Sequence, residues 1–156
     1  MPTDRAPNGS PGGKARLLPS MLVAARQLAT LRQKEVALEA GLDQSYVCAL
    51  ERGRRQVPRH DVLDALCRGL KLGDDECLEL SWAAAHDRVL AALSGEGLAS
   101  HAALVSAALR AAHYLGASEL AGLERQILQA VQSKQHLLAL EAEALRSVTE
   151  KEKVMT

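Results

Sequence analysis

The stretch from Gln33 to Arg55, QKEVALEAGLDQSYVCALERGRR, constrains the fold of this chain more than any other part of it. It predicts two short helices joined by a tight turn, with apolar Val36 and Ala40 on the inner face of the first helix. Gly41 is expected to end that helix, because a residue without a Cβ atom readily takes the left-handed conformation found after helix C-termini. Asp43 is expected to cap the N-terminus of the second helix.

The second helix, expected over residues 44–52, combines an apolar inner face with a polar, uncharged outer face. Val47 and Leu50, three residues apart, point inward. The outward positions are Gln44, Ser45, Cys48, Ala49 and Arg52. Arg54 and Arg55 follow directly. A helix with such a face and a cationic exit is typical of an element that reads the major groove of DNA.

The two helices together resemble the helix-turn-helix of the Cro/CI-type (Xre) repressor family. The residues at the family's spacing are Leu31, Gln33, Ala37, Gly41, Val47 and Leu50, with the runs Ser45–Val47 and Glu51–Gly53. Small Ala37 fits the place where the two helices cross closely. The resemblance covers about residues 17–72. It implies an all-α, five-helix, lambda-repressor-like DNA-binding domain over residues 17–93.

The resemblance also implies which side chains contact DNA. Base contacts fall to Gln44, Ser45 and Ala49, with Cys48 as a further candidate. Gln44 can form a bidentate pair with adenine, whereas Ala49 offers only an apolar contact to a thymine methyl group. Phosphate contacts fall to Gln33, Arg32, Lys34, Tyr46, Arg52, Arg54 and Arg55. Because the outer face carries few strong hydrogen-bonding groups, Arg52, Arg55 and the shape of the DNA are further candidates for specificity.

One further implication of the resemblance concerns stability. A basic residue seven positions before Gln33 pairs, in the family, with the acid that corresponds to Glu51. We therefore expect an Arg26–Glu51 ion pair that braces the second motif helix. Its role is structural, since removing one partner of a buried pair is costly even where the pair itself adds little net stability.

Charge is distributed unevenly along the chain although the 156 residues have a net charge of zero. Residues 1–73 hold 12 Lys and Arg against 7 Asp and Glu, a net charge of +5, and residues 74–156 hold 7 against 12, a net charge of −5. This asymmetry indicates a basic half that faces nucleic acid and an acidic half with another task.

Composition favours an all-α protein and excludes several other classes. Ala and Leu dominate, Phe is absent and Trp occurs once. No apolar run approaches the roughly 20 residues that span a membrane, and no signal peptide is visible, so we expect a cytoplasmic protein. The three cysteines lack zinc-type spacing, and the five histidines are scattered. We therefore expect no metal, no cofactor and no enzymatic activity.

Outside the motif, residues 1–16 predict a flexible basic arm, either solvated or lying on DNA. The first helix is expected over Leu18–Thr30, with Leu22, Ala25, Leu28 and Ala29 buried. A helix over Arg59–Leu70 closes the core with Val62, Leu63, Leu66, Cys67 and Leu70. A helix over Asp75–Leu93, capped by Asp74, is expected to bury Leu78, Leu80, Trp82, Ala85, Val89 and Leu93.

The segment 98–150, after a glycine-containing joint at Ser94–Gly97, predicts helical oligomerisation. A helix over His101–Leu115 is followed by a longer one, capped by Ser118, that reaches about Val148. The residues expected at its dimer interface are Leu120, Leu123, Ile127, Val131, Leu138 and Leu145. Lys134 and Glu141 interrupt one heptad register, so an intertwined helical dimer is favoured over a strict coiled coil. The alternative is an intramolecular bundle in a monomer.

These observations predict a sequence-specific transcriptional regulator that binds double-stranded DNA as a homodimer. Two-fold symmetry places two reading helices in successive major grooves, so the operator should be an inverted repeat. One alternative is an antitoxin whose acidic C-terminal helices bind a toxin protein. Another is an activator or adaptor whose acidic helices dock on RNA polymerase or a further protein. A third, from another class, is an enzyme or a metal-dependent sensor, which a metal bound on purification would support.

Overall fold

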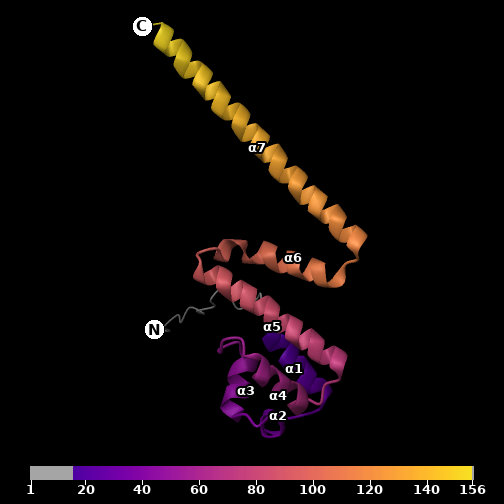
Figure 1. Cartoon of the computed structure of the whole chain (residues 1–156). Helices are drawn as coiled ribbons and strands as arrows, with labels where there is room; N and C mark the ends of the chain where they lie inside the picture. The colour runs from indigo at the N-terminus through magenta and orange to yellow at the C-terminus, as the bar shows by residue number, and fades with distance from the viewer. Residues whose placement is uncertain (1–15, 156) are drawn as a thin grey trace, which may run out of the picture. The chain divides into compact units, whose positions relative to one another are not determined.

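The computed structural model describes residues 16–155, which are helical apart from short connections (Figure 1). The helices are α1 (Leu18–Leu28), α2 (Gln33–Ala40), α3 (Gln44–Glu51), α4 (His60–Gly69), α5 (Asp74–Gly95), the 3₁₀ turn η2 (Ala99–His101), α6 (Ala102–Tyr114) and α7 (Ala117–Val154). The all-α prediction is confirmed. Most of the predicted N-terminal arm lies outside the described residues.

The chain divides into two compact units, and the division falls inside α6, between Leu109 and Arg110. The predicted joint at residues 94–97 forms the last residues of α5 and the turn before η2, where Gly97 has a φ of 75°. Among the described residues no helix is long and apolar enough to cross a membrane.

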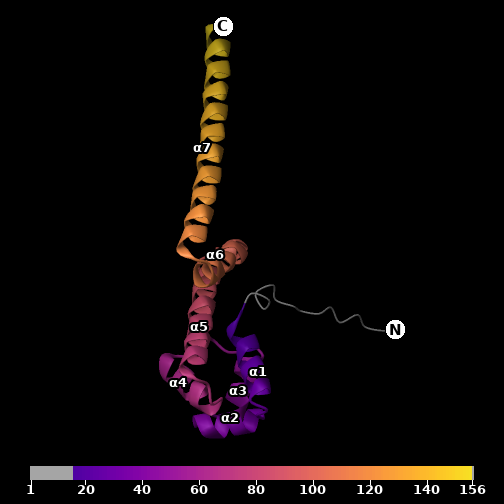
Figure 2. The ribbon, with the colours of Figure 1, turned by 90° about the vertical axis from the view of Figure 1, so that its right-hand side faces the viewer.

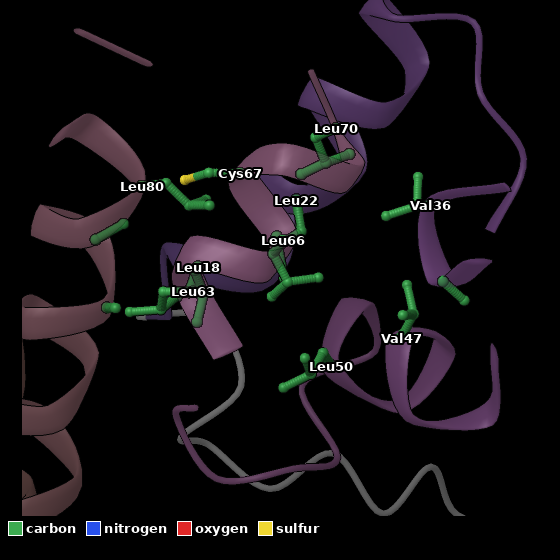
Figure 3. Close-up of a cluster of buried hydrophobic side chains, with 13 residues drawn as sticks. Leu18, Leu22, Val36, Val47, Leu50, Leu63, Leu66, Cys67, Leu70 and Leu80 are labelled. Atoms are coloured by element: carbon green, nitrogen blue, oxygen red, sulfur yellow. The ribbon is translucent and has the colours of Figure 1, made fainter. Parts of the chain in front are cut away.

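The hydrophobic core of the first unit is built from α1–α5 (Figure 3). Its buried aliphatic residues are Leu18, Leu22, Val36, Val47, Leu50, Leu63, Leu66, Leu70 and Leu80. Two alanines of α5, Ala83 and Ala84, are fully buried. The predicted inner faces of α2, α3 and α4 are therefore confirmed at these positions. Burial of these side chains supplies the main favourable free energy of folding.

Helix α1 ends earlier than predicted, at Leu28 rather than Thr30. Thr30 has a φ of 56°, a left-handed conformation that a helix cannot contain. Because the chain turns here, Leu28 is 85 % exposed, and the prediction that Leu28 and Ala29 are buried is wrong. Leu22 is buried, and Ala25 packs against the core as expected.

Helix α5 presents only part of the predicted face to the core: Leu80 is buried and Trp82 packs against the core, as predicted. Gly73 rather than Asp74 is its N-cap, with the Gly73 amide donating to the Glu76 carboxylate at 2.9 Å. Leu78 is 68 % exposed, and Ala85 and Val89 are also exposed, so their predicted burial is wrong. The buried residues are Leu80, Ala83, Ala84, His86, Asp87 and Leu90. Between Leu80 and Leu90 the inner face thus consists of small and polar residues, which a search for large apolar residues excludes.

Asp87 explains why α5 turns this face inward. Its carboxylate, 1 % exposed, accepts hydrogen bonds from the backbone amides of Leu17 at 2.8 Å and Leu18 at 3.0 Å. These amides belong to the start of α1, whose first turn has no side-chain cap of its own. Buried His86 joins the network, with Nδ1 2.9 Å from Asp87 and Nε2 2.9 Å from the Ser106 hydroxyl of α6. Asp87 therefore caps α1 from a distant helix.

Helix α7 is one uninterrupted helix of 38 residues, about 57 Å long (Figure 2). Its N-cap is Gly116, whose amide donates to Glu119 at 2.9 Å, so the prediction that Ser118 caps it is wrong. It also runs past the predicted end near Val148 to Val154. Lys151 and Lys153 in its last turn interact favourably with the negative end of the helix dipole.

Candidate nucleic-acid interface

The turn between α2 and α3 is fixed by three local interactions. Gly41, with a φ of 66°, ends α2 in the left-handed conformation. The Leu42 amide then donates to the Ala37 carbonyl at 2.8 Å, and Leu42 packs against the core. Asp43 caps α3 by accepting from the Ser45 amide at 2.7 Å. The predicted caps are confirmed, and they fix how α3 leaves the turn.

The outer surface of α3 carries the polar residues expected there. Gln44 and Ser45 are exposed, whereas Cys48 and Ala49 are only half-exposed. The Ser45 hydroxyl donates to the Asp43 carboxylate, and this hydrogen bond, followed by that from the Ser45 amide, lowers the pKa of Asp43. Ser45 is therefore left with a hydroxyl oxygen that can accept, and Gln44 is the residue of α3 best placed to both donate and accept.

A bidentate ion pair joins the C-terminal end of α3 to α1. Arg26 Nε lies 2.6 Å from Glu51 Oε1, and Arg26 Nη2 lies 3.0 Å from Oε2. The Gln33 side-chain amide donates to the same carboxylate at 2.7 Å, and Arg26 also donates to the Leu31 carbonyl at 3.1 Å. The hydrogen bond to Glu51, opposed by desolvation, raises the pKa of Arg26. The pair expected from the family resemblance is thus present, and it ties α1, α2 and α3 together.

Arg26→Ala and Glu51→Ala are each expected to destabilise the domain by about 3 kcal/mol, because each leaves a largely buried charge without its partner. The side chains are only 18 % and 5 % exposed. The double variant Arg26→Ala with Glu51→Ala should cost less than the two single variants combined, by at least about 1 kcal/mol. Urea unfolding followed by circular dichroism measures the three values. Strict additivity would show that the two side chains act independently.

The Gln33 side chain is partly engaged within the domain, whereas a dedicated phosphate ligand would be free. Its side-chain amide is already bound to Glu51, and one N–H of that amide stays available to a phosphate. Arg32 and Lys34, on either side of it, are exposed at the start of α2. The first-turn amides of a helix also attract anions. Hydrogen-bond donors and positive charge are therefore exposed to solvent at the N-terminus of α2.

A cationic hollow follows α3. It is open, has a volume of about 480 Å³, and is lined by Tyr46, Arg54, Arg55, Gln56, Val57, Pro58, Arg59 and Val62. The Arg55 guanidinium lies 5.7 Å from the centre of the Tyr46 ring, within the range of a cation–π interaction. Arg52, Arg54 and Arg55 are all exposed. Positive charge therefore gathers beside the exit of α3.

The basic loop after α3, residues 52–59, is held by two arginine side chains that were not predicted from the sequence. Arg88 of α5 donates to the Pro58 carbonyl at 2.6 Å, and Arg16 donates to the Gly53 and Arg55 carbonyls at 3.0 and 3.1 Å. Arg59, which also lines the hollow, was missed too. Only Pro58, after the arginine pair, indicates this arrangement in the sequence. It predicts an extended segment after α3, but not which side chains hold that segment in place.

The sulfur and imidazole groups of the described residues do not gather into a metal site: residues 16–155 contain no group of three or more His, Cys, Asp or Glu side chains suited to one. Burial, followed by a hydrogen bond with Cys77, raises the pKa of the Cys67 thiol to about 12. Cys67 is thus a core thiol, as expected. His86 is occupied by Asp87 and Ser106.

Comparison with known proteins agrees with this geometry over the first unit. Neither the curated proteins nor the solved structures gave a significant match to the chain. Residues 22–80 match the family model described as "Helix-turn-helix domain". The match begins within α1, ends within α5 and includes the whole α2–turn–α3 unit. Residues 22–80 are therefore a helix-turn-helix domain, which is a DNA-binding fold.

Proposed function

We propose that this chain is a sequence-specific transcriptional regulator of the Cro/CI (Xre) type that reads DNA through α3. One observation carries the proposal: α3 exposes Gln44 and Ser45 while the arginines at its exit, Arg52, Arg54 and Arg55, are exposed beside it. A helix presented in this way fits the major groove, with its cations at the phosphates on either side.

The contacts divide into reading and positioning. Gln44 pairs with a base edge, and Ser45, Cys48 and Ala49 shape the rest of the reading surface. Phosphates are bound at two places: the start of α2, through Arg32, Gln33 and Lys34, and the exit of α3, through the three arginines and Tyr46. The Arg26–Glu51–Gln33 network supports this division, because it fixes α3 relative to the first-turn amides of α2.

A homodimer is part of the proposal. Helix α7 has no buried residue, and its exposed apolar residues include Leu123, Ile127, Val131, Leu138 and Leu145. A helix with such a stripe gains stability by pairing. Two copies would place two α3 helices on a two-fold symmetric operator.

The test is selection of bound fragments from a random pool of DNA duplexes by the purified full-length chain. The expected result is one enriched sequence that contains an inverted repeat. Recovery of general, salt-sensitive binding alone would contradict sequence-specific regulation, and would favour a protein partner for the acidic half as the source of function.

Arg54→Ala should weaken binding to all duplexes alike, since a phosphate contact carries no sequence information. The slope of log affinity against log salt concentration should fall in magnitude by about 0.9 for one lost contact. Fluorescence anisotropy at several salt concentrations gives the slope. The matched control is Arg125→Ala, an exposed charge on α7. Equal slopes for the two variants would show that Arg54 lies away from the DNA.

A further inference from the structure

We propose that α7 pairs with α7 of a second copy in the antiparallel direction, centred between Leu137 and Leu138. The proposal rests on the homodimer of the proposed function and adds the direction and register of its interface. Its evidence is the order of charged and apolar residues along a single face of this helix.

The face is a long apolar stripe whose side chains are exposed among the described residues. Ile127, Leu138 and Leu145 are 53 %, 52 % and 69 % exposed, and Val131 and Val148 are exposed as well. The helix is continuous over 38 residues, so these side chains follow the helical period along most of its length. An amphipathic stripe of this length is too long to be covered by a short helix and matches another helix of equal length.

Two opposite charges lie within the stripe. Lys134 and Glu141 are seven residues apart, and each lies only about 40° around the helix from a stripe leucine: Lys134 from Leu138, and Glu141 from Leu145. Both are therefore at or beside any helix–helix contact made by this face. Whatever packs on α7 must accommodate a cation and an anion about two turns apart.

The relative direction of the two α7 helices decides whether these charges attract or repel each other. In a parallel, in-register pair, Lys134 faces Lys134 of the second copy, and Glu141 faces Glu141. In an antiparallel pair centred between Leu137 and Leu138, residue numbers that face each other sum to 275, because the centre lies midway between the two residues. Lys134 then faces Glu141 of the second copy, and the two-fold axis repeats this contact. Like charges at a contact cost free energy, and opposite charges favour it.

The apolar residues of this face also match each other when the second helix runs in the opposite direction. With this centre Ile127 faces Val148 of the second copy, the Leu138 residues of the two copies lie within one residue of each other along the axis, and Val131 lies within one residue of Leu145. The stripe thus maps onto itself when the helix is reversed. A parallel pair would require no such symmetry. Charge and apolar order together therefore favour a second copy running in the opposite direction.

Parallel and antiparallel pairs place the first residues of the two α7 helices at different distances from each other. In the antiparallel pair the two Ala117 residues lie at opposite ends of the interface, about 60 Å apart along its axis at 1.5 Å per residue. In a parallel pair they lie side by side. The direction is thus measurable in the full-length chain.

Charge reversal tests the pairing. Lys134→Glu and Glu141→Lys should each weaken dimerisation of the full-length chain about ten-fold, measured by sedimentation equilibrium, because each creates two like-charge contacts. The double variant should recover the wild-type dissociation constant. Arg125→Glu, the same change of charge on the opposite side of α7, should have little effect. In a parallel pair like charges face each other in the wild type and in every variant, so neither single reversal would weaken dimerisation, and that result would overturn the antiparallel arrangement.

Cross-linking gives an independent measurement. Mixed Ile127→Cys and Val148→Cys chains should form a disulfide between positions 127 and 148, identified by peptide mapping. A disulfide between two copies of Ile127→Cys would overturn the antiparallel arrangement, as would a wild-type chain that stays monomeric at all concentrations. Binding of the same variants to duplex DNA separates this failure from failure of the proposed function, because α3 does not include these positions.

Discussion

Gly69→Ala should lower the free energy of unfolding by about 3 kcal/mol, even though alanine normally stabilises a helix relative to glycine. Gly69 is buried at the end of α4, where that helix packs on α2. A Cβ atom there would lie 2.7 Å from the Val36 carbonyl oxygen and 2.9 Å from the Ala40 Cβ atom. Because the first of these is backbone, α2 would have to move away from α4.

Equilibrium unfolding in urea measures this change. The matched control is Gly95→Ala at the end of α5, where an added Cβ atom meets nothing within 4 Å. That variant should be neutral or stabilised by up to about 1 kcal/mol. If Gly69→Ala proved as stable as the control, α2 and α4 would be farther apart than the structure shows.

Asp87→Ala should destabilise the first unit by about 3 kcal/mol or more, because it removes the shared acceptor of three buried or half-buried donors. The donors are the Leu17 amide, the Leu18 amide and, where Nδ1 carries the proton, His86. Asp87→Asn should cost less, since its side-chain oxygen can still accept from one of the amides.

Differential scanning calorimetry gives the melting temperatures of these variants. Asp75→Ala serves as the control, because Asp75 is an exposed carboxylate in the first turn of the same helix. Its loss should cost no more than about 1 kcal/mol. An Asp87→Ala variant with the melting temperature of the control would refute the capping of α1 by α5.

The α2–turn–α3 unit could be predicted from the sequence because its determinants are local. Gly41 is the residue that permits the left-handed cap, and Asp43 acts on an amide two residues away. Val47 and Leu50 are then placed by helical periodicity alone. The exposure of Gln44 on the outer face of α3 depends on these same local features.

Leu80 was predicted to be buried, but the rest of the inner face of α5 could not be predicted because its determinants are distant. Asp87 lies about 70 residues from the amides that it caps. A sequence pattern gives a buried aspartate no reason to point inward, so Leu78 and Val89 were assigned to the core instead. The Arg88–Pro58 contact, which holds the basic loop, was missed for the same reason.

The candidate site was predicted in its residue types more than in its hydrogen bonds. The exposure of Arg54 and Arg55 follows from their place after Gly53, a turn residue with a φ of 65°. That Ser45 donates to Asp43, and Gln33 to Glu51, depends on side-chain positions that no spacing specifies. The Ser45–Asp43 contact increases the share of base reading that falls to Gln44.

The most direct test of base reading by α3 is the ratio of affinities for the selected operator and for a scrambled duplex, measured at one salt concentration with the wild-type chain and with Gln44→Ala. We predict a wild-type ratio of about 10³ or more. For Gln44→Ala we predict a loss of about 1–3 kcal/mol per half-site on the operator, with little change on scrambled DNA. A wild-type ratio near one, or a Gln44→Ala variant that keeps the full ratio, would contradict base reading by this residue.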